Sequence, residues 1–466
     1  MISNVGADKN MNGNSTKSTL QGPSIQIDPL FPYYLNRTAE SIADEIKNAG
    51  YLIVHYFVVN EYNVASDLID AFHKRGISVW AMVIGNGTFD TRHLPTHWQD
   101  WRMGMLKDPK DGFERLSLFA PDYIGWKKAA LSRLVQENPF DGIEIAEPYF
   151  PEWDGIRRGI YGDVGHFASE AFHEECGMEI PDFTNEQASN YYLNTPEIYR
   201  QWISLRVRAV NGFVNEMING VDGVRSVRPD ILVATWSLAV NAPNALEKVK
   251  EWQGVDAVSM IGLVKPDIHF LQTHWPDWMQ RLLSPDYVKG YEVFTAQIRA
   301  AYPSLPLGIQ TDIGSLSGMV RSREWLNQFQ NTVFDLGYDT WSAYEYHLGG
   351  YMSGEPPIPL YALRTGEEEL LISFNKRIDP ESNVTIVIHP WSKEALMEVE
   401  IFPDMRLEFD GNRVLARKIH LPTGSFEVEV RGMKDTPSLW HSKGERANEV
   451  PQGMRIRVQH SLHRSL

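Results

Sequence analysis

The chain has 466 residues, of which 43% are hydrophobic and 22% charged, a composition that is typical of folded globular proteins and excludes wholesale disorder. Its formal net charge of −16 argues against a nucleic-acid partner, because binding phosphates requires a concentrated basic surface. The single cysteine, Cys176, excludes an intrachain disulfide. Residues 1–22 form a polar leader without the apolar core of a signal peptide, and no segment approaches the roughly 18 apolar residues of a membrane span. We therefore expect a cytoplasmic protein with no membrane partner.

Apolar, strand-like segments alternate with amphipathic, helix-like segments over residues 23–366. Strands are predicted over residues 24–28, 51–59, 77–84, 140–146, 231–236, 255–261, 307–312 and 340–346. Helices are predicted over residues 38–49, 64–75, 121–136, 196–218, 285–301 and 323–336. This rhythm is typical of right-handed βαβ crossovers, and eight such units predict an α/β fold, a closed (β/α)₈ TIM barrel. A doubly wound open sheet is the rival architecture, but the chain lacks its Gly-rich phosphate turn.

After residue 366 the hydrophobic pattern changes to a period of two, and turn residues separate the alternating segments. Strands are predicted there over residues 370–375, 383–389, 395–402, 413–420 and 425–431. The pattern indicates a C-terminal antiparallel β-sandwich domain over residues 367–432, which we expect to cover a flank of the barrel. Residues 433–466 have a weak apolar pattern and are predicted to form a tail.

The strand end within residues 141–151, DGIEIAEPYFP, carries the strongest chemical signal. Barrel enzymes draw their active residues from the carboxyl ends of the strands and the loops that follow them. Glu144 and Glu147 are three residues apart, so on a strand they would point to opposite faces, and only one can face the barrel mouth. Glu147 stands where the strand ends, before Pro148, and a residue before proline is pushed toward extended geometry. We therefore predict that the Glu147 side chain enters the cleft.

This region resembles the glycoside hydrolases that fold as (β/α)₈ barrels. Residues 120–151 are similar to a family of glycosyl hydrolases with matching positions at Pro121, Asp122, Asp141, Gly142, Ile143, Tyr149 and Pro151. The segment Ala146-Glu147-Pro148 is also similar to the Asn-Glu-Pro motif at strand four of clan A enzymes, with Ala146 in place of the Asn. The resemblance implies a hydrolase of O-glycosyl bonds in which Glu147 is the acid/base.

Glycoside cleavage needs a second carboxyl group across the scissile bond. If Glu147 is the acid, the partner must come from another strand end, and the seventh and eighth predicted strands offer Asp312 and Glu345. We favour Asp312 as base or nucleophile because its surroundings in the sequence are more polar, and we keep Glu345 as the other candidate.

A sugar also requires polar partners for its hydroxyl groups and an aromatic ring on which to pack. Such residues stand at or after several predicted strand ends. The substrate-binding candidates are Asp28, His55, Trp236, His274, Trp275, Gln310, Tyr344 and His347. No cofactor and no metal are expected: His93 and His97 are four residues apart, but Pro95 between them disrupts the helical zinc spacing.

Two other functions stay open beside the hydrolase. The first is a barrel that binds carbohydrate without catalysis. The second is a lyase or aldolase that forms a Schiff base on Lys265, which follows the predicted sixth strand. The sequence leaves the sugar, its anomer, endo or exo action and the formation of a homo-oligomer undecided.

Overall fold

The computed structural model of the chain describes residues 20–151, 156–312, 317–346, 354–391, 397–399, 405–440 and 446–460. Within these ranges, no helix combines the length and the apolar character that are needed to cross a membrane.

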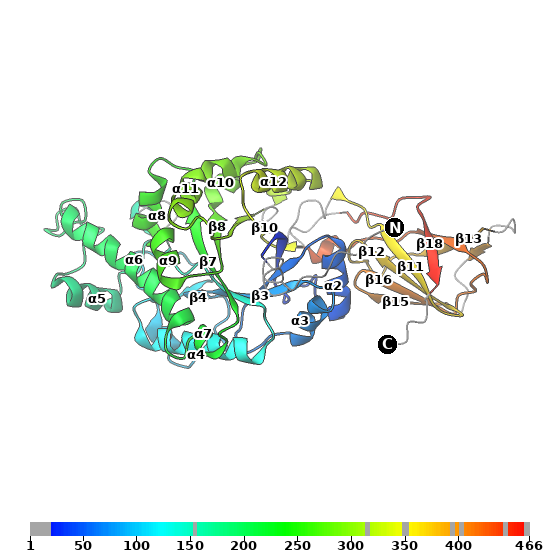
Figure 1. Cartoon of the computed structure of the whole chain (residues 1–466), viewed down its shortest axis with the longest axis horizontal. Helices are drawn as coiled ribbons and strands as arrows, with labels where there is room; N and C mark the ends of the chain where they lie inside the picture. The colour runs from blue at the N-terminus through cyan, green and yellow to red at the C-terminus, as the bar shows by residue number, and fades with distance from the viewer. Residues whose placement is uncertain are drawn as a thin grey trace, which may run out of the picture.

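Eight parallel strands close into a barrel in the order β1-β10-β9-β8-β7-β6-β3-β2 (Figure 1). They are β1 (Gly22–Ile27), β2 (Ile53–Val58), β3 (Ser78–Ile84), β6 (Gly142–Ala146), β7 (Leu232–Ala239), β8 (Ile268–Thr273), β9 (Leu307–Thr311) and β10 (Thr340–Ala343). These strands are buried along almost their whole length, which is why they are apolar without alternation in the sequence. The predicted TIM barrel is confirmed.

Helices connect the strands and cover the outside of the barrel. They are α2 (Ala39–Asn48), α3 (Ser66–His73), α4 (Pro121–Glu137), α5 (His166–Cys176), α6 (Pro196–Asn219), α7 (Val224–Val227), α8 (Ala245–Gln253), α9 (Ala257–Val264), α10 (Trp275–Trp278), α11 (Glu292–Ala301) and α12 (Arg323–Asp335). The caps follow from the sequence: the Thr38 side chain accepts a hydrogen bond from the backbone N–H of Ser41, and Ser322 caps α12 in the same way.

The prediction of the sixth strand over residues 255–261 is wrong. Most of this segment belongs to α9, because the Asp256 side chain accepts a hydrogen bond from the backbone N–H of Ser259 and so starts a helix. The sixth strand is β8, and Lys265 lies before it, directly after α9. Lys265 is therefore at the amino-terminal end of the barrel, where (β/α)₈ enzymes do not place their chemistry. The Schiff-base alternative loses its basis.

The loop after β3 folds back over the barrel mouth. A small hairpin pairs β4 (Gly87–Thr88) with β5 (Glu114–Arg115) and holds this loop in place. Gly85, directly after β3, lies against the turn that follows β6, and a Cβ there would come within 2.7 Å of the Cα of Pro148. A glycine at this position therefore lets the two loops approach each other closely.

The C-terminal strands form one sheet in the order β14-β13-β17-β18-β11-β12-β16-β15. They are β11 (Pro359–Gly366), β12 (Glu369–Phe374), β13 (Thr385–Pro390), β14 (Met397–Val399), β15 (Arg406–Asp410), β16 (Arg413–Arg417), β17 (Phe426–Arg431) and β18 (Arg455–His460). All neighbours are antiparallel except β11 and β18, and buried side chains from both halves of the sheet share one core. The fold is therefore sandwich-like, as predicted.

The limits of this sheet differ from those predicted. β11 begins before residue 367, and β18 lies within the predicted tail, where it pairs with β11 and β17. The tail prediction is wrong for this strand, whose Val458 side chain is buried in the domain core although Arg455 and Arg457 precede it in the sequence.

The C-terminal sheet docks on the barrel beside α2 (Figure 1). The Arg413 Nε donates to Asp44 at 2.9 Å, and the backbone N–H of Thr38 donates to Asp410 at 2.7 Å. This contact is on the flank of the barrel, so the sheet leaves the barrel mouth to the loops.

Candidate active site

A cleft of about 320 Å³ opens at the carboxyl ends of the barrel strands. The loops after β3, β6, β8, β9 and β10 contribute to its wall, which is where a (β/α)₈ barrel places its chemistry. Five residues that the sequence predicted line it: Glu147, Trp275, Gln310, Asp312 and Tyr344. The other lining residues are Asn86, Phe89, Asp111, Phe113, Arg115, Tyr149, Pro151, Leu238, Gln253, Gln272, Thr273 and Trp278.

Glu147 follows β6 directly and has a φ of 50°, in the left-handed region that non-glycine residues seldom occupy. The expectation of an extended backbone before Pro148 is therefore wrong. Residues held in this region cluster at functional sites, where the surrounding structure fixes them. Burial raises the pKa of the Glu147 carboxyl, although the hydrogen bond from Gln272 and the charge of Arg115 act in the opposite direction. A raised pKa favours the protonated carboxyl, the form that a proton donor requires.

Gln272, at the end of β8, holds the Glu147 carboxyl in place. Its Nε2 donates to the Glu147 Oε1 at 2.8 Å, and its Oε1 accepts a hydrogen bond from the Tyr149 hydroxyl. These two bonds fix the orientation of the amide, because the donor and the acceptor each have one partner of the right kind. Sequence reasoning did not select Gln272, since the sixth strand had been placed too early. Tyr149 enters the prediction only as one matching position of the family resemblance.

Asp312 follows β9 and lines the same cleft as Glu147. Tyr344, after β10, lies close enough to Asp312 and Glu147 for their charges to affect its pKa. Burial raises the pKa of its phenol well above the ordinary value, and the charges of Asp312 and Glu147 raise it further. Tyr344 therefore stays neutral and can donate a hydrogen bond within the cleft.

Glu345 and Asp28 lie next to this cleft but do not line it. Glu345 is 1% exposed, and its carboxylate accepts hydrogen bonds from the backbone N–H of Asp28 at 2.7 Å, the backbone N–H of Tyr346 at 3.0 Å and the Tyr34 hydroxyl. Asp28 itself accepts a hydrogen bond from the backbone N–H of Leu30 at 2.9 Å. These contacts tie β1 to β10, so we leave both residues out of the proposed site.

His55 and Trp236 are inside the barrel and do not line the cleft. The His55 Nδ1 lies 2.5 Å from one oxygen of Glu144, and the Trp236 Nε1 donates to the other oxygen at 2.8 Å. The second nitrogen of His55 is 2.8 Å from the Ser24 hydroxyl. Both residues have their hydrogen-bond partners inside the barrel and neither lines the cleft, so we correct the prediction that they contact a substrate.

His274 is 5% exposed and does not line the cleft, whereas Trp275, the next residue, does. The remaining predicted residue, His347, lies outside the described part of the chain. Trp278, one turn further along α10, joins Trp275 on the cleft wall and was not predicted.

No family model and no curated protein matches the sequence. Among solved structures, the chain is similar to the PgaB (BpsB) glycoside hydrolase domain from Bordetella bronchiseptica, with 14% identity, a TM-score of 0.53, and coverage of 72% of this chain and 96% of that one. The chain also matches an endo-β-1,4-mannanase from Thermotoga petrophila, with 11% identity, a TM-score of 0.33, and coverage of 95% and 98%. The glycoside hydrolase domain of PelA from Pseudomonas aeruginosa matches with 8% identity, a TM-score of 0.38, and coverage of 70% and 95%.

Of these three, only the first is similar enough to show a shared fold. The chain has the barrel fold of a glycoside hydrolase domain. The resemblance that the sequence indicated is therefore confirmed at the level of the fold, and the assignment of chemistry has to come from the cleft itself.

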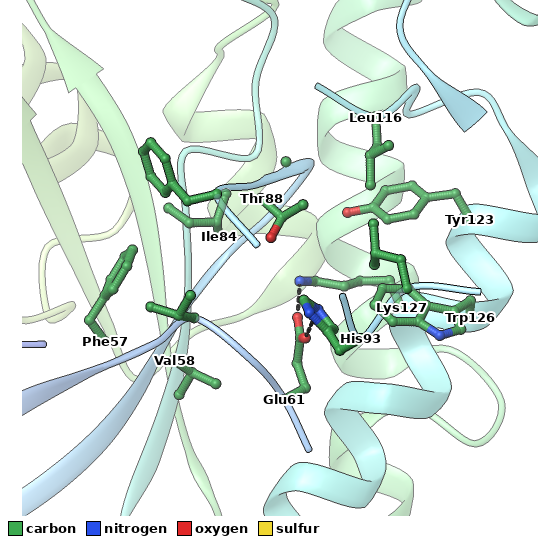
Figure 2. A pocket seen from close by; sticks show the side chains of 14 residues that line it. Phe57, Val58, Glu61, Ile84, Thr88, His93, Leu116, Tyr123, Trp126 and Lys127 are labelled. Carbon is green, nitrogen blue, oxygen red and sulfur yellow. Dashed lines mark hydrogen bonds and ion pairs between the residues drawn. The ribbon is translucent and has the colours of Figure 1, made fainter. Parts of the chain in front are cut away.

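A second, much smaller pocket lies beside the barrel, under the loop after β3 (Figure 2). Its volume of about 10 Å³ is only enough for one water molecule. Figure 2 shows the Glu61 carboxylate facing Lys127 and His93, and the His93 Nε2 lies 3.0 Å from Glu61. Burial alone would raise the pKa of Glu61, but Lys127 and His93 lower it to about 2.

This ion cluster anchors the loop that forms one wall of the cleft, because His93 belongs to the loop, whereas Lys127 comes from α4. Phe89, in the same loop, borders both pockets. Among the described residues, no group of three or more His, Cys, Asp or Glu side chains is placed to hold a metal ion. His93 thus links the loop to Glu61.

Proposed function

We propose that the protein is a glycoside hydrolase that cleaves a glycosidic bond in an oligosaccharide or a glycoside. Glu147 is the proton donor, and Asp312 is the base or nucleophile. The observation that carries the proposal is the shared cleft: Glu147, with its raised pKa, and Asp312 line one cavity at the carboxyl ends of the barrel strands. Two carboxyl groups in unlike environments are what glycoside hydrolysis requires.

In the proposed reaction, the protonated Glu147 carboxyl gives its proton to the oxygen that leaves the sugar. The Gln272 amide holds the carboxyl so that the proton points to one place. Asp312 then either attacks the anomeric carbon or takes a proton from the water that attacks it. In both cases Glu147 ends the cleavage step as a carboxylate. In a retaining reaction it then removes a proton from the incoming water.

The lining of the cleft suits a neutral sugar. Aromatic side chains can pack against its C–H faces, and carboxamide and phenol groups can bind its hydroxyl groups. The aromatic residues of the wall are Phe89, Phe113, Tyr149, Trp275, Trp278 and Tyr344. Phe89 and Phe113 contact each other with ring centroids 4.7 Å apart, and Phe89 is 64% exposed, so its ring is free to meet a ligand. We therefore retain Trp275, Gln310 and Tyr344 as substrate-binding residues.

A barrel that only binds carbohydrate is the rival function. The geometry favours the enzyme, since Glu147 and Asp312 line one cleft and burial shifts the Glu147 pKa upward, toward the form that a proton donor needs.

The test is turnover of a panel of aryl glycosides and neutral oligosaccharides by the parent and by Glu147→Gln, Asp312→Asn and Glu345→Gln. We expect Glu147→Gln and Asp312→Asn to lower kcat by about 10²–10⁴-fold, the usual contribution of a general acid or base, without loss of stability. Glu179→Gln is the matched control, because that side chain is 81% exposed. Full activity of Glu147→Gln would contradict the proposal, and a parent that binds sugars without turnover would support the rival function.

A further inference from the structure

Gln253 is a buried polar residue in the cleft with an unmet need for a hydrogen bond. It is the last residue of α8, is 2% exposed and lines the cleft. Its side-chain Oε1 is buried and has no hydrogen-bond partner within the described ranges. Buried polar atoms are nearly always paired, so an exception on the wall of a cleft calls for a physical reason.

Two other carboxamides of this wall, Gln272 and Asn86, do have side-chain hydrogen bonds. Both ends of the Gln272 amide are hydrogen-bonded, and the Asn86 Nδ2 donates to the backbone carbonyl of Tyr149 at 3.1 Å. Removing a buried amide from water without a partner is unfavourable, whereas leucine in the same place would carry no such penalty. An unpaired buried amide therefore weakens the free protein, which is typical of a group that meets a ligand.

The position of Gln253 indicates what it would meet. Its backbone carbonyl accepts a hydrogen bond from the N–H of Phe150 at 3.1 Å, which ties it to the loop after Glu147. On the other side, the ring of Trp252 lies 6.4 Å from that of His274, the residue before Trp275. Gln253, Glu147 and Trp275 all line the same cleft.

We propose that Gln253 binds the substrate directly, pairing its amide with hydroxyl groups of a neutral sugar unit that packs against Trp275. The inference rests on the proposed function and adds a subsite to it. A carboxamide offers one donor group and one acceptor without charge, so it matches neighbouring hydroxyl groups and gives no preference for an acidic or a basic sugar. Trp275 supplies the surface on which the ring of that unit lies.

The experiment measures stability and binding of Gln253→Leu in the Glu147→Gln background, so that no ligand is consumed. The probes are tetrasaccharides of β-1,4-linked mannose, glucose, xylose and N-acetylglucosamine, titrated by calorimetry. Gln330→Leu is the matched control: Gln330 lies outside the cleft and accepts a hydrogen bond from the Trp341 Nε1 at 3.2 Å.

We expect Gln253→Leu to leave the Tm unchanged or higher and to raise the Kd of the bound tetrasaccharide about tenfold, the effect of one or two neutral hydrogen bonds. Gln330→Leu should lower the Tm and leave the Kd unchanged. A lower Tm with unchanged binding in Gln253→Leu would overturn the inference and leave the proposed function standing. If none of the tetrasaccharides binds to the Glu147→Gln protein, the inference fails; the proposed function fails only if the parent also turns over none of the glycoside panel.

Discussion

Glu144 in the barrel interior and Glu147 in the cleft above it are only three residues apart in the sequence, but their surroundings differ. Glu144 is 0% exposed, and both its oxygens have partners, His55 at 2.5 Å and Trp236 at 2.8 Å. Glu147 has one amide partner, a raised pKa and a place on the wall of an open cavity. Burial alone therefore does not identify a functional carboxyl. The useful signs are an incomplete set of partners and access to a ligand.

Removal of Glu144 should have the largest effect on the protein. We expect Glu144→Ala to lower the free energy of unfolding by about 3–5 kcal/mol, because it leaves a cavity and strips His55 and Trp236 of their buried partner. Urea unfolding followed by tryptophan fluorescence measures this change. Glu147→Gln, which keeps the shape of the side chain, should unfold at nearly the parent midpoint. Equal stability of Glu144→Ala and the parent would show that the interior glutamate is not structural.

The barrel and the position of Glu147 at its mouth could be predicted from the sequence because their signals are local. The apolar strands and the break at Pro148 are visible in a short window, and Glu147 and Asp312 follow from strand ends. The error at residues 255–261 came from a short apolar run that fits a helix and a strand equally well, and the cap at Asp256 decided it.

Because of this error, Gln272 was not predicted as a site residue. A sixth strand over residues 255–261 puts the wrong residues at the barrel mouth. The opposite error occurred with His55 and Trp236, which do belong to barrel strands. Their side chains face the interior, and the register that turns them inward depends on neighbouring strands rather than on local sequence. The direction of the Glu144 side chain depends on strand register in the same way.

A third buried carboxylate, Glu61, is paired with Lys127 in the ion cluster under the cleft wall. The pKa of Glu61 is about 2 in the folded protein against an ordinary 4.5, so the folded state prefers the carboxylate. Stability from this group is present above pH 4.5 and is lost as the pH falls toward 2. The difference corresponds to roughly 3 kcal/mol.

Lys127→Met should remove much of this stabilisation, because Lys127 is the main cause of the low pKa. We expect the Tm of the variant to be lower at pH 7 and to change less than that of the parent between pH 5 and pH 2. Lys128→Met is the matched control, since Lys128 pairs with Glu216 in a partly exposed bridge. If parent and Lys127→Met lost stability in parallel over this pH range, the cluster would not be the source of the acid sensitivity.

A smaller effect is expected when the Gln272 amide, which donates a hydrogen bond to the Glu147 carboxyl, is removed. Gln272 donates to Glu147 and so holds its pKa below the value that burial alone would give. The proposed acid works in its protonated form, and activity should therefore decline as the pH rises through the Glu147 pKa. Gln272→Leu removes the donor, so the alkaline limb of kcat/KM should move to higher pH. The loss of one neutral hydrogen bond should lower kcat/KM by about tenfold at the optimum. Gln253→Leu, which touches the cleft but not Glu147, should lower kcat/KM without moving that limb. An alkaline limb at the same pH in Gln272→Leu and the parent would mean that a group other than Glu147 sets it.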